Sequence, residues 1–300
     1  MQAQSAPRPR RLDLVGGHGN ALTADLYAPA GGQGPLALLV HGGGQTRHAW
    51  KGAAFALARR GWCAVTLDQR GHGESAWMPD AAYALSDYAG DVGAVAASLR
   101  EKGFGQPAVV GASLGGMAGL LAAVEPGADF RALVLVDITP KVRPGGVDRI
   151  VAFMRSNAGT GFASLEEAAA AISAYLPHRP PPSDLSGLAK NLRLGDDGRY
   201  RWHWDPRFLD ASGSAKSDWN AAEQRLTDAA LRIRIPVLLV RGRESELVGE
   251  REAEAFRALV PHAKVADVGG ARHMVAGDRN DAFTDAVLDF LEKPEVLAPA

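Results

Sequence analysis

Residues 109–116 read VVGASLGG and join an apolar run to the alanine- and leucine-rich stretch LGGMAGLLAAV (114–124). The apolar run predicts a buried strand, and the following stretch predicts a helix that begins at once. A strand, the motif Gly111-x-Ser113-x-Gly115 and a helix, in that order, are typical of a sharp turn that exposes a serine at a helix N-terminus. Glycines at the flanking positions let such a turn close without a clash. The stretch therefore predicts Ser113 as a catalytic nucleophile.

Short apolar runs bounded by turn residues recur along the chain and predict strands. These runs are RRLDLV (10–15), ALTADLYA (21–28), LALLV (36–40), CAVTLD (63–68), PAVVG (107–111), ALVLVD (132–137), PVLLVRG (236–242) and AKVADVG (263–269). From the third run onward they are almost continuously apolar, as expected of strands that are covered on both faces. Apolar residues at helical spacing predict helices over 46–60, 88–102 and 280–292. The alternation predicts an α/β fold with a mostly parallel eight-stranded sheet and helices on both faces.

The strand pattern stops between residues 139 and 225, where short helical patterns take over and three of the six tryptophans lie. A helical insertion between two strands of a parallel sheet predicts a cap over the sheet edge where ligands bind. The alternative is a linker whose helices only pack against the core. We therefore divide the chain into a first core part (1–138), a helical cap (139–225) and a second core part (226–300).

The composition excludes several classes of partner. The 300 residues carry a formal net charge of -1, and the only basic cluster is a weak one near the N-terminus, which argues against nucleic acid or an anionic membrane. Residues 1–11 have no apolar signal segment and no apolar run is long enough to span a bilayer, so we expect a cytoplasmic protein. The single cysteine, Cys63, fits a reducing compartment. No metal-ligand spacing or nucleotide-binding glycine pattern is present, so no metal and no cofactor are expected.

A serine hydroxyl is a weak nucleophile at neutral pH and needs both a base and a site for the developing oxyanion. The glycines of LALLVHGGG (36–44) follow a predicted strand and allow backbone N–H groups to face an oxyanion. We expect the N–H of Leu114 to be one donor and that of Gly43, or its neighbour Gly44, to be the other.

The base is expected near the C-terminus. His273 lies between the last predicted strand and the final helix, where the chain order serine, acid, histidine places the base. His41, His48 and His72 are the alternatives. For His41 and His72, which lie in loops at the same sheet edge, we expect hydrogen bonds to the backbone that shape those loops.

Together these motifs resemble the α/β-hydrolase fold superfamily over nearly the whole chain. They are HGGG (41–44), DQRGHGES (68–75), GASLGG (111–116), LVDITP (135–140) and GARHMV (270–275), each following a predicted strand. More narrowly, HGGGQTRHAW (41–50) and YRWHWDPRF (200–208) are similar to bacterial serine hydrolases that include monoalkyl phthalate ester hydrolases. Members of that set are often labelled epoxide hydrolases or haloperoxidases. Because epoxide hydrolysis needs an aspartate nucleophile and this chain has Ser113, that label does not fit.

The resemblance implies a carboxylate that orients His273. Glu244 and Glu246, in RGRESELVG (241–249), follow the seventh predicted strand, where the superfamily most often has aspartate. Asp137 follows the sixth predicted strand, where some members have their acid. The apolar pair after Glu246 resembles the residues that follow the family's acid, and Ser-His-Glu relays exist in this fold. Glu246 is therefore the leading candidate, and Asp137 and Glu244 are the alternatives.

The predicted activity is hydrolysis of carboxylic esters through an acyl-enzyme on Ser113, with small to medium substrates, aromatic ones being one option. Arg47 and His48 follow the glycine loop and are the predicted substrate contacts. Arg47 would pair with a substrate carboxylate or, alternatively, be a solvent-exposed helix residue. Hydrolysis of carbon–carbon bonds and cofactor-free peracid formation use the same residues and are alternatives. A noncatalytic small-molecule receptor is an alternative of another class, and the sequence does not predict an oligomeric state.

Overall fold

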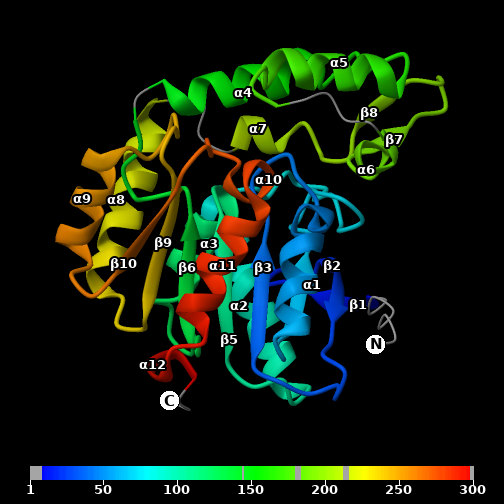
Figure 1. Ribbon diagram of the computed structural model, residues 1–300. Coiled ribbons are helices and arrows are strands. Elements are labelled where there is room, and N and C mark those ends of the chain that lie inside the picture. The colour runs from blue at the N-terminus through cyan, green and yellow to red at the C-terminus, as the bar shows by residue number, and fades with distance from the viewer. Residues whose placement is uncertain (1–8, 144, 180–183, 212–215, 298–300) are drawn as a thin grey trace.

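The computed structural model describes residues 9–143, 145–179, 184–211 and 216–297 (Figure 1). Residues 1–8, on which part of the argument against a secretory signal depends, lie outside these ranges. An eight-stranded sheet forms the centre, in the order β1-β2-β4-β3-β5-β6-β9-β10. Its strands are β1 (Arg10–Val15), β2 (Ala21–Tyr27), β3 (Leu36–Val40), β4 (Cys63–Leu67), β5 (Pro107–Ala112), β6 (Ala132–Val136), β9 (Val237–Gly242) and β10 (Lys264–Val268). Strand β2 is antiparallel to both β1 and β4, and every later pair is parallel, which confirms the predicted sheet.

Helices cover both faces of the sheet (Figure 1). One face carries η1 (Arg47–Trp50), α1 (Lys51–Arg59), α11 (Asn280–Leu291) and α12 (Pro294–Leu297), and the other carries α2 (Leu85–Glu101), α3 (Leu114–Ala122), α8 (Lys216–Arg232) and α9 (Glu250–Leu259). The short helix α10 (Val275–Asp278) precedes α11. Within the described ranges, no helix is both long and apolar enough to cross a bilayer.

Strand β3 explains why the central runs are apolar throughout. Leu36, Leu38 and Val40 pack on the face of α2 and α3, whereas Ala37 and Leu39 pack on the face of α1 and α11. Successive side chains of a strand point to opposite faces, so strands covered on both sides have few positions for polar residues. Because the strands from β4 to β10 run parallel, their carboxyl ends meet at one edge of the sheet. Polar residues of the loops that follow these strands can gather at that edge.

The turn between β5 and α3 has the strained geometry that the sequence predicted. Ser113 has a φ of 47° and a ψ of -115°, in a region that residues other than glycine rarely adopt. A Cβ atom on Gly111 would overlap the carbonyl group of Gly115, and one on Gly115 would overlap that of Val40. Both glycines are thus required because other backbone segments occupy the space of a side chain.

The segment between β6 and β9 lies across the carboxyl ends of the strands (Figure 1). It comprises α4 (Gly146–Ser156), α5 (Leu165–Tyr175), α6 (Ser186–Ala189), β7 (Leu192–Leu194), β8 (Tyr200–Trp202), α7 (Phe208–Ala211) and the start of α8. The Ser164 hydroxyl caps α5 by accepting the Glu167 N–H at 3.2 Å. The β7–β8 hairpin was not predicted, because strands of three residues are too short to show a pattern. The predicted boundary at residue 225 falls inside α8, so the division into three parts stays a prediction.

Substituting alanine for Gly111 tests the tight turn. We expect Gly111→Ala to lower the free energy of unfolding by about 2–3 kcal/mol, because the new methyl group meets backbone atoms that cannot move aside. Gly93→Ala is the matched control: it lies in α2 with nothing within 4 Å of the added Cβ, and should stabilise by about 0.5–1 kcal/mol. Urea unfolding measures both. Equal effects of the two substitutions would contradict this account of the turn.

Candidate active site

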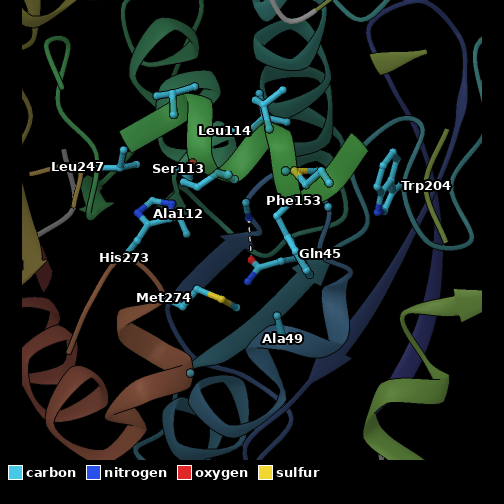
Figure 2. A pocket seen from close by; sticks show the side chains of 18 of the residues that line it. Gln45, Ala49, Ala112, Ser113, Leu114, Phe153, Trp204, Leu247, His273 and Met274 are labelled. Carbon is cyan, nitrogen blue, oxygen red and sulfur yellow. Dashed lines mark hydrogen bonds between the residues drawn. The ribbon is translucent and has the colours of Figure 1, made fainter. Parts of the chain in front are cut away.

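Ser113 lines a cavity of about 480 Å³ that lies between the sheet edge and the β6–β9 segment. Gly43, Leu114 and His273 line the same cavity, and Figure 2 draws Ser113 and His273 on the same side of it. Four residues from three separate loops are thus brought together because β3, β5 and β10 all end at this edge.

The His273 ring is bonded to Asp137 and not to the leading candidate, Glu246. His273 Nδ1 lies 2.8 Å from Asp137 Oδ2. The Glu246 carboxylate instead accepts the backbone N–H of His273 at 3.4 Å, and Glu244 is exposed. The preference for Glu246 is therefore corrected to its alternative: the carboxylate that reaches the imidazole belongs to the sixth strand of the sheet and not to the seventh.

Asp137 occupies a buried, strained position directly after β6. Its φ is 51° and its side chain is fully buried. One carboxylate oxygen accepts the backbone N–H of Gly242 at 3.2 Å, and the other accepts the hydroxyl of Ser245 at 2.5 Å as well as facing His273. Burial raises the pKa of this carboxyl group, and the bonds from His273, Ser245 and Gly242 oppose that rise.

The sequence could not decide whether the acid follows β6 or β9, because the ends of these two strands lie next to each other. Strands β6 and β9 pair in parallel register, with Val136 opposite Val240. A carboxylate after either strand can therefore approach a histidine loop at the same edge. The deciding features are the positive φ of Asp137 and the direction of its side chain, which no local pattern encodes.

The glycine loop presents one free amide to the cavity. The N–H of Gly42 is taken by the side-chain oxygen of Gln45 at 3.0 Å (Figure 2), and the N–H of Gly44 is taken by Nε2 of His72 at 3.1 Å. In the described part of the chain, the N–H of Gly43 has no acceptor. Leu114 is the first residue of α3, and the first N–H groups of a helix lack an intrahelical acceptor. Of the predicted donors, Gly43 and Leu114 are thus available, whereas the alternative Gly44 is not.

Two of the alternative histidines have structural roles. His41 lies 2.8 Å from the Gly42 carbonyl and accepts the Gln69 N–H at 3.1 Å, while His72 lies 2.9 Å from the Arg70 carbonyl. Each ring thus donates from Nδ1 and accepts at Nε2, which requires it to be neutral. Burial lowers the pKa of His41 to about 4. Burial also lowers the pKa of His72, to about 3, and the neighbouring His41 ring contributes to that shift. The expectation that both histidines shape their loops through the backbone agrees with these contacts.

Arg47 and His48 do not lie where the sequence analysis placed them. Neither lines the cavity. The Arg47 side chain is 8% exposed and forms ion pairs with Asp25 at 3.0 Å, Asp68 at 2.5 Å and Glu74 at 2.6 Å. Although burial opposes its charge, these carboxylates raise the pKa of Arg47. The structure does not bring Arg47 to the cavity as predicted, because its guanidinium group is paired with three carboxylates outside the cavity wall.

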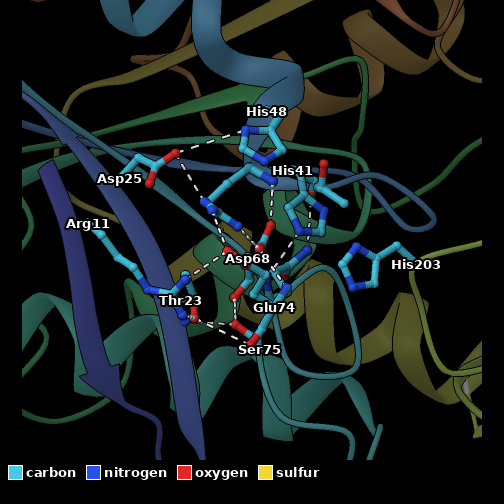
Figure 3. A network of polar contacts seen from close by, with 12 residues as sticks. Arg11, Thr23, Asp25, His41, His48, Asp68, Glu74, Ser75 and His203 are labelled. Atoms are coloured by element: carbon cyan, nitrogen blue, oxygen red, sulfur yellow. Dashed lines mark hydrogen bonds and ion pairs between the residues drawn. The ribbon is translucent and has the colours of Figure 1, made fainter. Parts of the chain in front are cut away.

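The ion pairs of Arg47 belong to a larger network that joins the loops after β3 and β4 (Figure 3). Asp68 accepts both the backbone N–H of Arg47 and that of Glu74, at 2.6 and 2.9 Å. His48 borders the network, with Nδ1 at 4.0 Å from Asp25, and burial followed by the nearby Arg47 charge lowers the pKa of His48. The network anchors the glycine loop from outside the cavity.

Aromatic side chains from the β6–β9 segment form much of the cavity wall. Phe153 stacks on Tyr175 with ring centroids 4.1 Å apart, and Trp202 meets Phe153 edge-on at 6.1 Å. Trp204 and Phe208 form a second edge-to-face pair at 5.2 Å. Sequence analysis noted the concentration of tryptophans in this segment but assigned none of them to the site. The wall is suited to apolar and aromatic groups.

Arg179 is a cationic side chain on the cavity wall that the sequence analysis also missed. Its Nε donates to the Asp278 carboxylate at 2.6 Å, so much of its charge is neutralised. His178 lies 3.2 Å from the same carboxylate. Among the described residues, no group of three or more His, Cys, Asp or Glu side chains is arranged to hold a metal ion.

A nucleophile elbow, a histidine–carboxylate pair and free amides at the end of a mostly parallel sheet define the class of serine hydrolases. The chain belongs to the α/β-hydrolase superfamily: the family model described as alpha/beta hydrolase fold matches residues 35–279. It is similar to Esterase Rv0045c of Mycobacterium tuberculosis, with 31% identity over 274 residues, covering 87% of this chain and 84% of that protein. It is also 30% identical over 264 residues to 2-(acetamidomethylene)succinate hydrolase of Mesorhizobium japonicum, covering 87% and 89%.

Solved structures agree with the fold. The crystal structure of E-2-(acetamidomethylene)succinate hydrolase superposes with a TM-score of 0.82 at 23% identity, covering 95% of this chain and all of that one. Esterase Rv0045c from Mycobacterium tuberculosis superposes with a TM-score of 0.72 at 27% identity, covering 96% and 92%. The predicted assignment to this superfamily, with resemblance to bacterial esterases, is confirmed, and the protein is a hydrolase.

Removing the Arg47 charge should affect stability and not substrate selection. We expect Arg47→Met to lower the free energy of unfolding by about 3–5 kcal/mol, because the buried carboxylates of Asp68 and Asp25 lose the cation that balances their charge. The ratio of KM for an acid-bearing half-ester to KM for its neutral diester should not change. Arg60→Met, which breaks the exposed pair with Glu292, is the control and should cost less than about 1 kcal/mol. A selective rise in KM for the half-ester would restore the original prediction.

Proposed function

We propose that this protein hydrolyses carboxylic esters with Ser113 as nucleophile, His273 as base and Asp137 as the acid. The observation that carries the proposal is the placement of Ser113 and His273 on one apolar cavity, with Asp137 bonded to the far nitrogen of the imidazole. The relatedness to an esterase supports the reaction class. The choice of Asp137 as the acid depends on its contact with His273, and the choice of ester hydrolysis depends on the similarity to an esterase.

Each group has a defined part in the proposed reaction. The Oγ of Ser113 attacks the ester carbonyl carbon while Nε2 of His273 takes its proton. The oxyanion accepts the N–H groups of Gly43 and Leu114, and Asp137 stabilises the imidazolium ion. The alcohol leaves with the proton from His273, and water activated by the same base then cleaves the acyl-enzyme to release the acid.

The cavity indicates the size and character of the substrate. A volume of about 480 Å³ falls in the range of pockets that enclose a small organic molecule. Its walls carry the ring pairs Phe153–Tyr175 and Trp204–Phe208. We therefore propose esters with a medium-length alkyl chain or an aromatic ring, which would replace water against these apolar surfaces.

Activity on a panel of p-nitrophenyl esters tests the reaction and the cavity together. We expect butyrate to octanoate esters to give higher kcat/KM than acetate, which leaves the wall unfilled, and than palmitate, which exceeds the cavity. Ser113→Ala should lower kcat by about 10³-fold or more with an unchanged Tm.

With a vinylogous diketone tested beside the esters, three other outcomes would contradict the proposal. Full turnover by Ser113→Ala would exclude the nucleophile. Cleavage of a vinylogous diketone in preference to every ester would favour the carbon–carbon hydrolase. Ligand binding with no turnover of any compound would favour the receptor alternative.

Paired substitutions decide between the two carboxylates. We expect Asp137→Asn to lower kcat by about 10³–10⁴-fold, because the amide neither balances the imidazolium charge nor holds the required tautomer. Glu246→Gln retains a side-chain oxygen that can accept the backbone N–H of His273, so kcat should stay within about threefold of the parent. Glu244→Gln, at an exposed position, is the control. Steady-state kinetics on the best ester provide the measurement, and a larger loss in Glu246→Gln than in Asp137→Asn would return the acid to the seventh strand of the sheet.

A further inference from the structure

Ser245 stands between the two glutamates that the sequence analysis considered, and it is the side chain of that loop that reaches the site. It is 2% exposed. Its Oγ donates to Asp137 Oδ2 at 2.5 Å, the same oxygen that lies 2.8 Å from His273 Nδ1. The loop after β9 thus contributes a hydroxyl group where many members of the superfamily have an acid.

The direction of the Ser245 proton follows from the other contacts of its oxygen. Oγ accepts the backbone N–H of Leu247 at 3.0 Å and that of Val248 at 3.1 Å. A hydroxyl has two lone pairs and one proton, so two accepted bonds leave only the O–H for Asp137. Accepting bonds also polarises the hydroxyl and strengthens its donation. The turn from 245 to 248 is therefore connected to the carboxylate through a single oriented hydrogen bond.

We propose that Ser245 is a positioning residue for catalysis: it fixes the Asp137 carboxylate toward His273 and favours its ionised form. The proposal rests on the proposed function, since it acts through the Asp137–His273 pair. Asp137 is fully buried and has no water shell to stabilise its charge, so each donor matters. Gly242 holds Oδ1, and Ser245 is the donor to Oδ2 besides the histidine.

The expected consequence is visible in the pH dependence. The active pair needs a neutral imidazole beside an ionised carboxylate, and the first proton that the pair takes up inactivates it. Loss of the Ser245 hydroxyl leaves a less stabilised, more basic carboxylate, so the pair holds that proton more tightly. The acid limb of the rate profile should therefore move to higher pH.

Labelling of Ser113 with a fluorophosphonate measures this without knowledge of the natural substrate. The Ser113 oxygen attacks phosphorus, fluoride leaves, and the serine proton passes to His273. We expect Ser245→Ala to lower the plateau rate constant by about three- to tenfold and to raise the midpoint of the acid limb by about half to one pH unit. Ser245→Cys keeps the size with a weaker donor and should fall between Ser245→Ala and the parent; it replaces Ser245→Ala if that variant does not fold.

A double-mutant cycle separates positioning from simple support of the turn. In an Asp137→Asn background, Ser245→Ala should change the labelling rate by less than about twofold and leave the limb in place. Ser164→Ala is the control, because the Ser164 hydroxyl also accepts a backbone N–H, here at the start of α5, but bonds no residue of the proposed triad. It should lower Tm without moving the limb.

The outcomes are distinct. A labelled parent together with an unshifted limb in Ser245→Ala overturns the role of Ser245 and leaves the proposed function standing. An equal loss of rate from Ser245→Ala in both backgrounds also overturns it, since the serine would then only support its turn. A parent that is not labelled at Ser113 overturns the proposed function and this inference with it.

Discussion

The buried carboxylate of Asp137 bonds to the loops that follow two other strands and so holds the ends of three strands together at one site. It follows β6, accepts hydrogen bonds from Gly242 and Ser245 after β9, and faces His273 after β10. An ionised group with no solvent around it must be surrounded by donors, so each of these loops is held to a narrow range of positions. The strained backbone at Asp137 is maintained by the parallel pairing of β6 with β9.

A second set of polar contacts shapes the side of the cavity that the glycine loop forms. The loop of residues 68–75 supplies His72, which takes the Gly44 N–H, and Asp68, which holds Arg47 at the other end of the glycine loop. His72 thus takes up the N–H of Gly44 and Gln45 that of Gly42, whereas the N–H of Gly43 has no acceptor among the described residues. The buried charges therefore contribute to the geometry of the site, although ion pairs of this kind add little net stability over apolar packing.

The cavity lies between these two sets of polar contacts and an aromatic wall from the β6–β9 segment. The core supplies Ser113 and His273, and Phe153, Tyr175 and Trp202 come from the segment that lies over the sheet edge. This arrangement allows substitutions in the wall to change which small molecule fits without moving Ser113.

Most of the fold could be predicted from local patterns. Apolar runs located the strands of the sheet because strands covered on both faces contain few polar residues, and Gly111-x-Ser113-x-Gly115 located the elbow because only glycine fits there. His273 followed from chain order. Contacts between residues distant in sequence were decided only by the tertiary structure. The sheet places the ends of β6 and β9 side by side, so that Asp137 reaches the imidazole and Glu246 does not.

The same limit explains Arg47 and the loop after β9. Arg47 follows the glycine loop in sequence, which predicted a contact with the substrate. In the structure its side chain instead pairs with Asp25 and Asp68. In RESELV the two glutamates attract attention because charge is visible in a sequence, whereas the serine between them is not conspicuous. Its importance depends on a carboxylate more than a hundred residues earlier in the chain. The sequence alone determined which elements form and which edge carries the site, and the packing of those elements decided which side chains meet there, because contact across a sheet depends on register and direction that local spacing does not contain.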